Sequence, residues 1–311
     1  MWVVLRIKAA GFYLYRALPL MTNKSLTIGI VFILLLPLVS FGQKMISGRL
    51  VDGQSGAPLA YATIALAKQN TGVNAKQDGS FSLMSRRSSE DTLLVSCVGY
   101  KTLRLPVAEL DSTIHLALQR LEKILKPVVV KTSWRNEDLG SFKVKPKHFF
   151  TTLGNQYQVA RKFSAPRAET WLQSVTIAVD GKRDASMFRI NVYDVDPENG
   201  GPGATLTDSA IWVNSKSGNI NVDLTAYLIY LPHPSFFVSV EWIQTEDNQD
   251  WRTTTINGKD STRMYYKPYI SITNHTLENK QDLWGLFYSG RWEPIPESYT
   301  VGLAIAARIR Y

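Results

Sequence analysis

The sequence is almost without cysteine and histidine. Among its 311 residues there is one cysteine, Cys97, and there are four histidines. A lone thiol cannot close an internal disulfide, so the fold must be stabilised by core packing rather than by cross-links. Because Cys97 stands in an apolar run, we expect it to be a small buried side chain and not a reactive thiol.

Recognisable catalytic and nucleotide-binding motifs are also missing. The sequence has no Gly-x-Ser-x-Gly elbow and no phosphate-cradling loop. His275 and Glu278 match the His-x-x-Glu pair of zinc carboxypeptidases, but no later histidine supplies the third ligand. The other histidines, at His115, His148 and His233, are scattered. We therefore predict that the protein is not an enzyme and needs no cofactor.

An excess of positive charge is present but small. The formal charge is +9, and four of the basic residues lie in the first 42 positions, which carry no acid. The rest of the chain has 31 basic and 26 acidic side chains, an excess of +5. This excess is neither a long basic run nor a nucleic-acid footprint, so a nucleic-acid partner is not expected.

The strongest local signal is a targeting segment. An apolar core at Leu26–Leu36 is broken by Pro37, and the small residues Ser40 and Gly42 precede a cut ahead of Gln43. This arrangement is typical of a secretory signal peptide, and the apolar core is too short for a comfortable membrane span. An uncleaved anchor helix is the alternative.

Cleavage at this position predicts an exported protein with no stable membrane span. Residues 1–42 would form the signal peptide, with Met21 as a candidate true start. No cysteine follows the cut, so a lipid anchor is not expected. The protein would reside in the periplasm, at the outer-membrane surface or outside the cell.

Residues 43–120 form a series of short apolar runs separated by Gly, Asp and Pro. The strands expected there are Met45–Asp52, Leu59–Ala67, Ser80–Leu83, Thr92–Val98 and Thr113–Leu118. About seven short strands in this length, with a turn every 8–12 residues, predict an immunoglobulin-like β-sandwich.

Four motifs in this module follow the order found in the carboxypeptidase regulatory-like domain. They are Ile46–Asp52, Gly56–Ile64, Asp78–Leu83 and Val95–Tyr100. The module resembles that small transthyretin-like sandwich, which is common in exported proteins of Bacteroidetes-type bacteria, often at the front of TonB-dependent receptors. The resemblance implies a fold and says little about function. We expect the ring of Tyr100 to pack while its hydroxyl reaches solvent.

Residues 121–147 are predicted to be a linker. Leu121–Lys131 resembles the stretch that leads into the plug of TonB-dependent receptors, and Thr132–Lys147 is polar and basic. The roughly 180 residues that follow are too few for such a receptor, whose barrel needs about 22 strands of roughly 10 residues.

Residues 148–311 are again rich in apparent strands. These are Thr170–Asp180, Ser186–Asp194, Ala210–Val213, Ile220–Leu224, Phe236–Ile243, Trp284–Tyr288 and Tyr299–Ile309. In the second of them, Phe188, Ile190 and Val192 alternate on one face. Helical periodicity is absent, so we predict a second, jelly-roll-like sandwich and an all-β chain.

This second half also resembles the domain that follows the regulatory-like module in many short exported Bacteroidetes proteins. The similarity lies in Phe188–Asp194, Gly201–Gly203, Val222–Leu224 and Phe237–Trp242. Proteins of this layout generally lack an assigned activity. The alternating last strand, which ends in an aromatic residue at Tyr311, keeps a small outer-membrane β-barrel as an alternative.

Aromatic side chains in the second half are the candidate ligand-binding groups. Trp251, Tyr265 and Tyr266 lie in polar stretches and are therefore expected to be exposed, and Trp292 belongs to the same aromatic set. Ring faces of this kind can stack on the C–H face of a sugar, and exposed apolar patches mark interaction sites. We predict that these four residues bind a carbohydrate or a peptide.

Two further chemistries remain open. Asp194–Gly200 is rich in oxygen ligands but lacks the spacing of a calcium loop, so a β-turn is favoured, with a structural calcium ion as the alternative. A hydrolase with an unrecognised site would need a pocket that joins acids such as Asp194, Asp223 or Glu241 with a histidine.

Together these features predict an exported, non-catalytic binding or interaction protein of the cell envelope. Its partners would be a polysaccharide or other envelope proteins. The first sandwich would serve as a spacer or docking module, and the second would carry the ligand site.

Overall fold

The computed structural model describes residues 2–9, 12–19, 43–86, 90–122, 133–140, 144–180, 185–256, 259–276, 283–295 and 301–311. The chain divides into two compact units, Met1–Gly42 and Gln43–Tyr311. In the first unit, β1 (Trp2–Ala9) and β2 (Phe12–Pro19) pair as an antiparallel hairpin. The apolar core of the predicted signal peptide lies outside the described residues. Within the described ranges, no helix has the length and hydropathy of a membrane span.

The first module of the larger unit is a sandwich of two small sheets. Its strands are β3 (Gln43–Asp52), β4 (Thr63–Leu66), β5 (Thr71–Asn74), β6 (Ser80–Arg86), β7 (Thr92–Ser96), β8 (Leu103–Pro106) and β9 (Thr113–Leu118), with a 3-10 turn η1 (Val107–Glu109). One sheet has the order β6–β3–β9 and the other β5–β4–β7–β8. Pairing is antiparallel except between β3 and β9. The predicted β-sandwich is confirmed.

Apolar side chains of both sheets fill the interior of this module. Ile46 and Leu50 of β3 meet Ile64 of β4 and Leu93 and Val95 of β7, and all five are fully buried. Alternate residues of a strand point to opposite faces, so these positions follow directly from the apolar pattern of each strand. Burial of such side chains contributes about 1.5–3 kcal/mol each.

Asp52 joins two of the sequence motifs inside the module. Its carboxylate accepts hydrogen bonds from the Tyr100 hydroxyl at 2.6 Å, from Arg120 Nε at 2.6 Å, and from the backbone N–H groups of Gln54 and Ser55. Tyr100 is half-buried and packs against the core, and its hydroxyl is held by Asp52. The hydrogen bond from Tyr100 is the main cause that lowers the pKa of Asp52 well below its usual 3.8. Burial, followed by the same bond, raises the pKa of Tyr100 to about 12.

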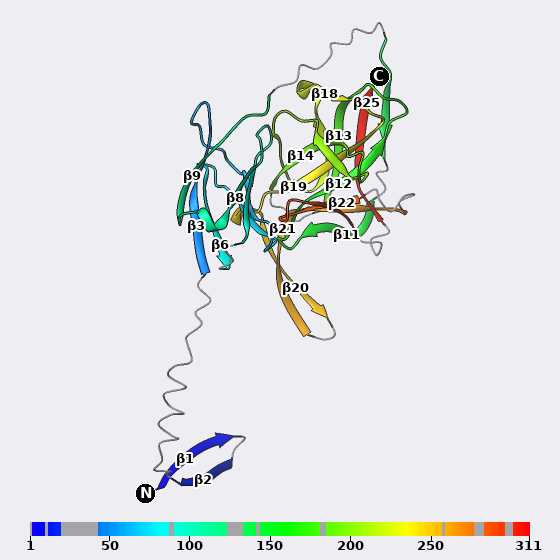
Figure 1. Ribbon diagram of the computed structural model, residues 1–311. Helices are drawn as coiled ribbons and strands as arrows, with labels where there is room; N and C mark the ends of the chain where they lie inside the picture. Colours follow the sequence, from blue (N-terminus) through cyan, green and yellow to red (C-terminus); the bar gives the residue numbers. More distant parts are fainter. Residues whose placement is uncertain are drawn as a thin grey trace. The chain divides into compact units, whose positions relative to one another are not determined.

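The second module consists of two larger antiparallel sheets (Figure 1). The nine-stranded sheet contains β10 (Asn136–Leu139), β11 (Val144–Thr152), β13 (Thr170–Asp180), β17 (Gly218–Asp223), β18 (Ile229–Leu231), β20 (Gln249–Ile256), β21 (Lys259–Thr276), β24 (Val301–Leu303) and β25 (Ile305–Arg310). The seven-stranded sheet contains β12 (Gln156–Ser164), β14 (Ser186–Val195), β15 (Pro202–Thr205), β16 (Ile211–Ser215), β19 (Ser235–Trp242), β22 (Leu283–Phe287) and β23 (Trp292–Pro294). Short 3-10 turns lie at η2 (Thr225–Tyr227) and η3 (Glu246–Asn248).

An apolar core lies between these two sheets. The seven-stranded sheet contributes Phe188, Ile190 and Val192, and the nine-stranded sheet contributes Val175 and Ile177. All five are fully buried, which confirms the predicted inward face of the strand at residues 186–194. The sequence alternation thus identified one face of β14 correctly.

Several strands lie where the sequence indicated a linker or no strand. β10 pairs with β25 and β11 pairs with β21, so the second module begins within residues 121–147. β10 reads Asn-Glu-Asp-Leu, which has no apolar alternation, and it is held by backbone pairing at a sheet edge. β20 and β21 are equally polar near their connection and extend as a long hairpin (Figure 1).

Candidate functional site

The two central strands of the first module's four-stranded sheet, β4 and β7, are buried on both faces. Ala65 of β4 and Leu94 of β7 alternate with core residues and point away from the module's own interior. They pack in a separate cluster with second-module side chains, namely Tyr157, Leu286 and Tyr288. The continuous apolar run around Leu94 is therefore explained by the second module, which covers the outer face of the strand.

Contacts between the two modules are close. A methyl group placed on Gly72 would lie 2.4 Å from Cε1 of Tyr288, so only glycine fits at this point. The backbone N–H of Gln244 donates to Asn74 Oδ1 at 2.8 Å across the interface. A packed interface with directional hydrogen bonds is typical of a fixed arrangement of domains rather than of loosely tethered ones.

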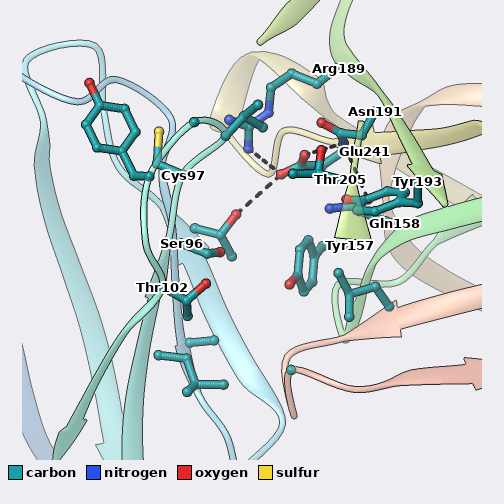
Figure 2. A pocket seen from close by; sticks show the side chains of 18 of the residues that line it. Ser96, Cys97, Thr102, Tyr157, Gln158, Arg189, Asn191, Tyr193, Thr205 and Glu241 are labelled. Atoms are coloured by element: carbon teal, nitrogen blue, oxygen red, sulfur yellow. Dashed lines mark hydrogen bonds and ion pairs between the residues drawn. The ribbon is translucent and has the colours of Figure 1, made fainter. Parts of the chain in front are cut away.

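A cavity of about 350 Å³ lies within this interface (Figure 2). The first module contributes β7 and the loop after it, with Ser96, Cys97 and Thr102. The second module contributes β12, β14 and β19, with Tyr157, Gln158, Arg189, Asn191, Tyr193 and Glu241. Small-molecule sites have volumes of about 300–1,000 Å³, so this cavity suits a small ligand or one end of a larger molecule.

A buried ion pair lies at the centre of the lining. Arg189 and Glu241 stand opposite each other on β14 and β19, and each is 2% exposed. Arg189 Nη2 donates to Glu241 Oε1, and Asn191 Nδ2 donates to Glu241 Oε2 at 2.9 Å. Thr63 Oγ1 of the first module also reaches Oε1, at 3.4 Å. These partners compensate the cost of removing the Glu241 carboxylate from water.

Gln158 organises a second group of hydrogen bonds beside the ion pair. Its Oε1 accepts from the Tyr193 hydroxyl at 3.0 Å and from Ser239 Oγ at 2.9 Å. Burial raises the pKa of Tyr193 and of Tyr157 well above the usual 10.0. Both side chains are therefore neutral hydroxyl groups at physiological pH, able to donate and to accept hydrogen bonds.

Some buried polar atoms of the lining have no hydrogen-bond partner among the described residues. These are Nε and Nη1 of Arg189, Oδ1 of Asn191 and the hydroxyl of Tyr288. Arg189 is 2% exposed, Asn191 1% and Tyr288 0%, so the surrounding protein shields all three from bulk solvent. Buried polar groups are nearly always paired with protein, water or a bound molecule. Arg189, Asn191 and Tyr288 belong to the cavity lining, so a polar molecule bound there is a candidate partner for them.

Cys97 also lines the cavity. It is partly buried and packs against the core of the first module, where a small buried side chain was expected. Burial is the main cause that raises the pKa of its thiol. A raised pKa disfavours the nucleophilic thiolate, so the thiol is not activated for covalent chemistry.

The structure does not bring the four predicted ligand residues together. Trp292 lines the cavity and packs edge-on against Tyr193 at 5.3 Å. Trp251 is 65% exposed on the β20–β21 hairpin. Tyr266 is 8% exposed and belongs to the second module's core, while its neighbour Tyr265 is half-buried on the opposite face of β21.

The acids proposed for a hydrolase are dispersed as well. Glu241 lies at the cavity, whereas Asp194 lies 2.8 Å from Nδ1 of His233 at the surface. Asp223 accepts a hydrogen bond from the backbone N–H of Thr225 at 2.9 Å. No histidine occurs in the described lining of the cavity.

Neither of the metal sites considered from sequence is assembled by the described residues. In the loop Asp194–Gly200, Asp196 Oδ1 accepts the backbone N–H of Glu198 at 2.9 Å, as in an ordinary Asx-stabilised turn. The described residues contain no group of three or more His, Cys, Asp and Glu side chains placed to hold a metal ion. His275 lies in β21, and Glu278 lies outside the described residues.

The sequence did not reveal Gln158, Arg189 or Asn191 as site residues. Each alternates with apolar core residues on its strand, and polar residues in that pattern are usually exposed to solvent. Only the apolar outer residue Leu94 of β7 indicated that another surface packs there. A pattern within one strand cannot identify which remote strand covers its outer face.

Comparison with known proteins identifies the first module. Residues 46–130 match the model of the CarboxypepD_reg-like domain. The match confirms the family resemblance and extends past the predicted boundary at residue 120. No curated protein matches the chain.

Among solved structures, the chain is similar to a clostridial cysteine protease after propeptide cleavage. The two are 13% identical, the match covers 85% of this chain and 70% of that chain, and the TM-score is 0.36. It is similar to the cysteine protease and lectin-like domains of a surface-layer-associated protein of Clostridium difficile, with 12% identity, 84% and 62% coverage, and a TM-score of 0.32. A protein of unknown function from Bacteroides fragilis has 13% identity, 74% and 96% coverage, and a TM-score of 0.21. Similarity this low carries no function to the present chain.

Proposed function

We propose that this chain, whose residues 46–130 match the CarboxypepD_reg-like domain, is an exported, non-catalytic binding protein of the cell envelope. Its ligand is a carbohydrate held in the cavity between the two modules. The observation that carries the proposal is the set of unpaired, buried polar atoms in that cavity. The signal-peptide pattern before Gln43 supports export.

The chemistry of the lining favours a polyhydroxylated ligand. A sugar hydroxyl both donates and accepts, so it is chemically suited to the unpaired N–H groups of Arg189, to Asn191 Oδ1 and to the Tyr288 hydroxyl. Trp292 belongs to the same lining and is half-buried, and the face of an aromatic ring suits the C–H groups of a sugar ring. A purely apolar ligand would leave the buried polar atoms unpaired, at a cost of about 1–3 kcal/mol each.

The arrangement of charges supports binding without catalysis. Glycoside hydrolysis generally uses two carboxyl groups on either side of the scissile bond. The described lining contains one carboxylate, Glu241, and its oxygens are occupied by Arg189, Asn191 and Thr63. A carboxylate held in this way is a structural partner of the guanidinium rather than a free general acid or base.

A glycan array probed with the purified chain tests the proposal, followed by calorimetric titration of the glycans that bind. We expect binding of at least one envelope-type glycan without release of new reducing ends. Asn191→Leu should abolish that binding, because it removes the open acceptor. Trp251→Ala is the matched control, since that ring lies on the β20–β21 hairpin and not in the cavity lining.

Two results would overturn the proposal. Absence of binding to every glycan would remove the carbohydrate assignment, and hydrolysis of a bound glycan would remove the non-catalytic one. Loss of binding in Trp251→Ala, with binding retained in Asn191→Leu, would place the ligand on the hairpin instead of in the cavity.

A further inference from the structure

We infer that the ligand of the inter-module cavity carries a carboxylate, as a uronic acid residue of a glycan does. This inference rests on the proposed function and specifies the class of sugar. It is carried by two observations: the incomplete pairing of the buried Arg189 guanidinium and the balance of charge around the cavity.

Arg189 retains capacity for a second anionic partner. Among the described residues only its Nη2 has a hydrogen-bond partner, Glu241, while Nε and Nη1 have none. The Trp212 ring covers the guanidinium, with Arg189 Cζ 5.1 Å from the ring centroid. A charged donor forms roughly twice as strong a hydrogen bond with a carboxylate as a neutral pair does. The unpaired N–H groups therefore favour a carboxylate over a sugar hydroxyl as a partner.

The charged residues around the cavity are mostly basic. Its lining contains Arg189, Lys101 and Arg104 as cations, with Glu241 as the carboxylate. Lys101 and Arg104 are exposed, which places their charges towards solvent, whereas Arg189 and Glu241 are buried. Two basic side chains facing solvent attract an anionic ligand to the cavity, and this attraction weakens as salt is added.

The remaining unpaired atoms favour an acidic sugar over a simple organic acid. Asn191 Oδ1 accepts hydrogen bonds only, so its partner must donate, and a carboxylate cannot. The Tyr288 hydroxyl needs a further polar group nearby. A uronic acid has both kinds of group, namely a carboxylate suited to Arg189 and hydroxyl groups suited to Asn191 and Tyr288.

The test compares uronic-acid oligosaccharides with the same oligosaccharides after chemical reduction of their carboxyl groups to alcohols. Affinity of the purified chain for each pair is measured by calorimetric titration at low and at high salt. We expect the acidic form to bind about tenfold more tightly, since hydrogen bonds to charged groups are stronger than neutral ones. We also expect the preference to shrink at high salt.

Variants at the exposed basic residues separate the charge effect from folding. The double variant Lys101→Gln/Arg104→Gln should weaken binding of the acidic form by roughly fivefold and leave the reduced form unchanged. The matched control is Lys216→Gln/Arg263→Gln, which removes the same charge from two exposed residues that are absent from the cavity lining. We expect no change in affinity for that control.

The outcomes distinguish this inference from the proposed function. Equal binding of acidic and reduced forms would overturn the acidic-sugar inference and leave carbohydrate binding intact. Binding of neither form, together with a negative glycan array, would overturn both. Tighter binding of a tetrapeptide with a free terminal carboxylate than of any oligosaccharide would replace the sugar by a peptide.

Discussion

Strand β14 has two buried faces with opposite chemistry. Its inward side chains enter an apolar core, and its outward side chains enter a polar cavity beneath the first module. The inward set is Phe188, Ile190 and Val192, and the outward set is Arg189, Asn191 and Tyr193. Burial alone therefore does not distinguish core from site, because both faces are withdrawn from water and only one is polar.

The two faces contribute differently to stability and to recognition. The inward face gains free energy from apolar burial, which is roughly proportional to area. On the outward face the cost of burying two charges offsets most of their attraction, so replacing such a pair by apolar residues is often neutral or stabilising. A polar interior that is this costly is better explained by ligand recognition than by stability of the fold.

Breaking the ion pair should have the largest effect. Glu241→Ala leaves the Arg189 guanidinium buried without its carboxylate, and we expect a loss of about 3–5 kcal/mol in the free energy of unfolding. Denaturant titration measures it. The double variant Arg189→Met/Glu241→Leu should recover most of that loss while abolishing ligand binding. A double variant less stable than Glu241→Ala would contradict the view that the pair serves recognition.

Truncation on the inward face should affect stability alone. Ile190→Ala opens a cavity in the apolar core, and we expect a loss of about 2–5 kcal/mol in the free energy of unfolding. Ligand affinity, measured by calorimetry under conditions in which the variant remains folded, should be unchanged. A tenfold loss of affinity would show that the two faces of β14 are coupled.

Overpacking the interface between the modules should have a moderate effect. Gly72→Ala places a methyl group 2.4 Å from the Tyr288 ring, and we expect a loss of about 1–3 kcal/mol. In the background Tyr288→Ala the same substitution should cost less, because the ring it meets is gone. Additive losses in this double-mutant cycle, measured by denaturant titration, would mean that the two residues are not in contact.

Alkaline pH should lower the stability of the protein through a buried tyrosine of the cavity lining, and this effect should be smaller than those above. Burial raises the pKa of Tyr288 well above 10.0, so folding favours its protonated form. The resulting stabilisation is fully present below pH 10 and is lost as pH rises through the folded-state pKa. At pH 11 the protein should be less stable than at pH 9, and Tyr288→Phe should remove about 1.4 kcal/mol of that pH dependence. Thermal unfolding at each pH measures the stability of both proteins. If Tyr288→Phe had the same pH dependence as the unchanged protein, burial of this hydroxyl would be contradicted.

The first module was the more predictable of the two. Its motif order identified the domain, and apolar alternation located β3 and β6. Residues that the sequence assigned to separate motifs, such as Asp52 and Tyr100, turned out to be hydrogen-bonded to each other. The second module was predicted less completely, since polar strands such as β10 and β20 depend on backbone pairing with distant partners, which leaves no periodic pattern in their own residues.

The sequence by itself determined the all-β class, the family resemblance of the first module and the inward face of β14. These depend on local properties, namely the two-residue period of a strand and the chemistry of its turns. Only the tertiary structure decided that the outward face of β14 is covered, and that Arg189 and Glu241 meet beneath β4 and β7. The physical reason is that a strand's own pattern reports which side chains share a face, whereas the surface that covers that face comes from residues far away in the chain.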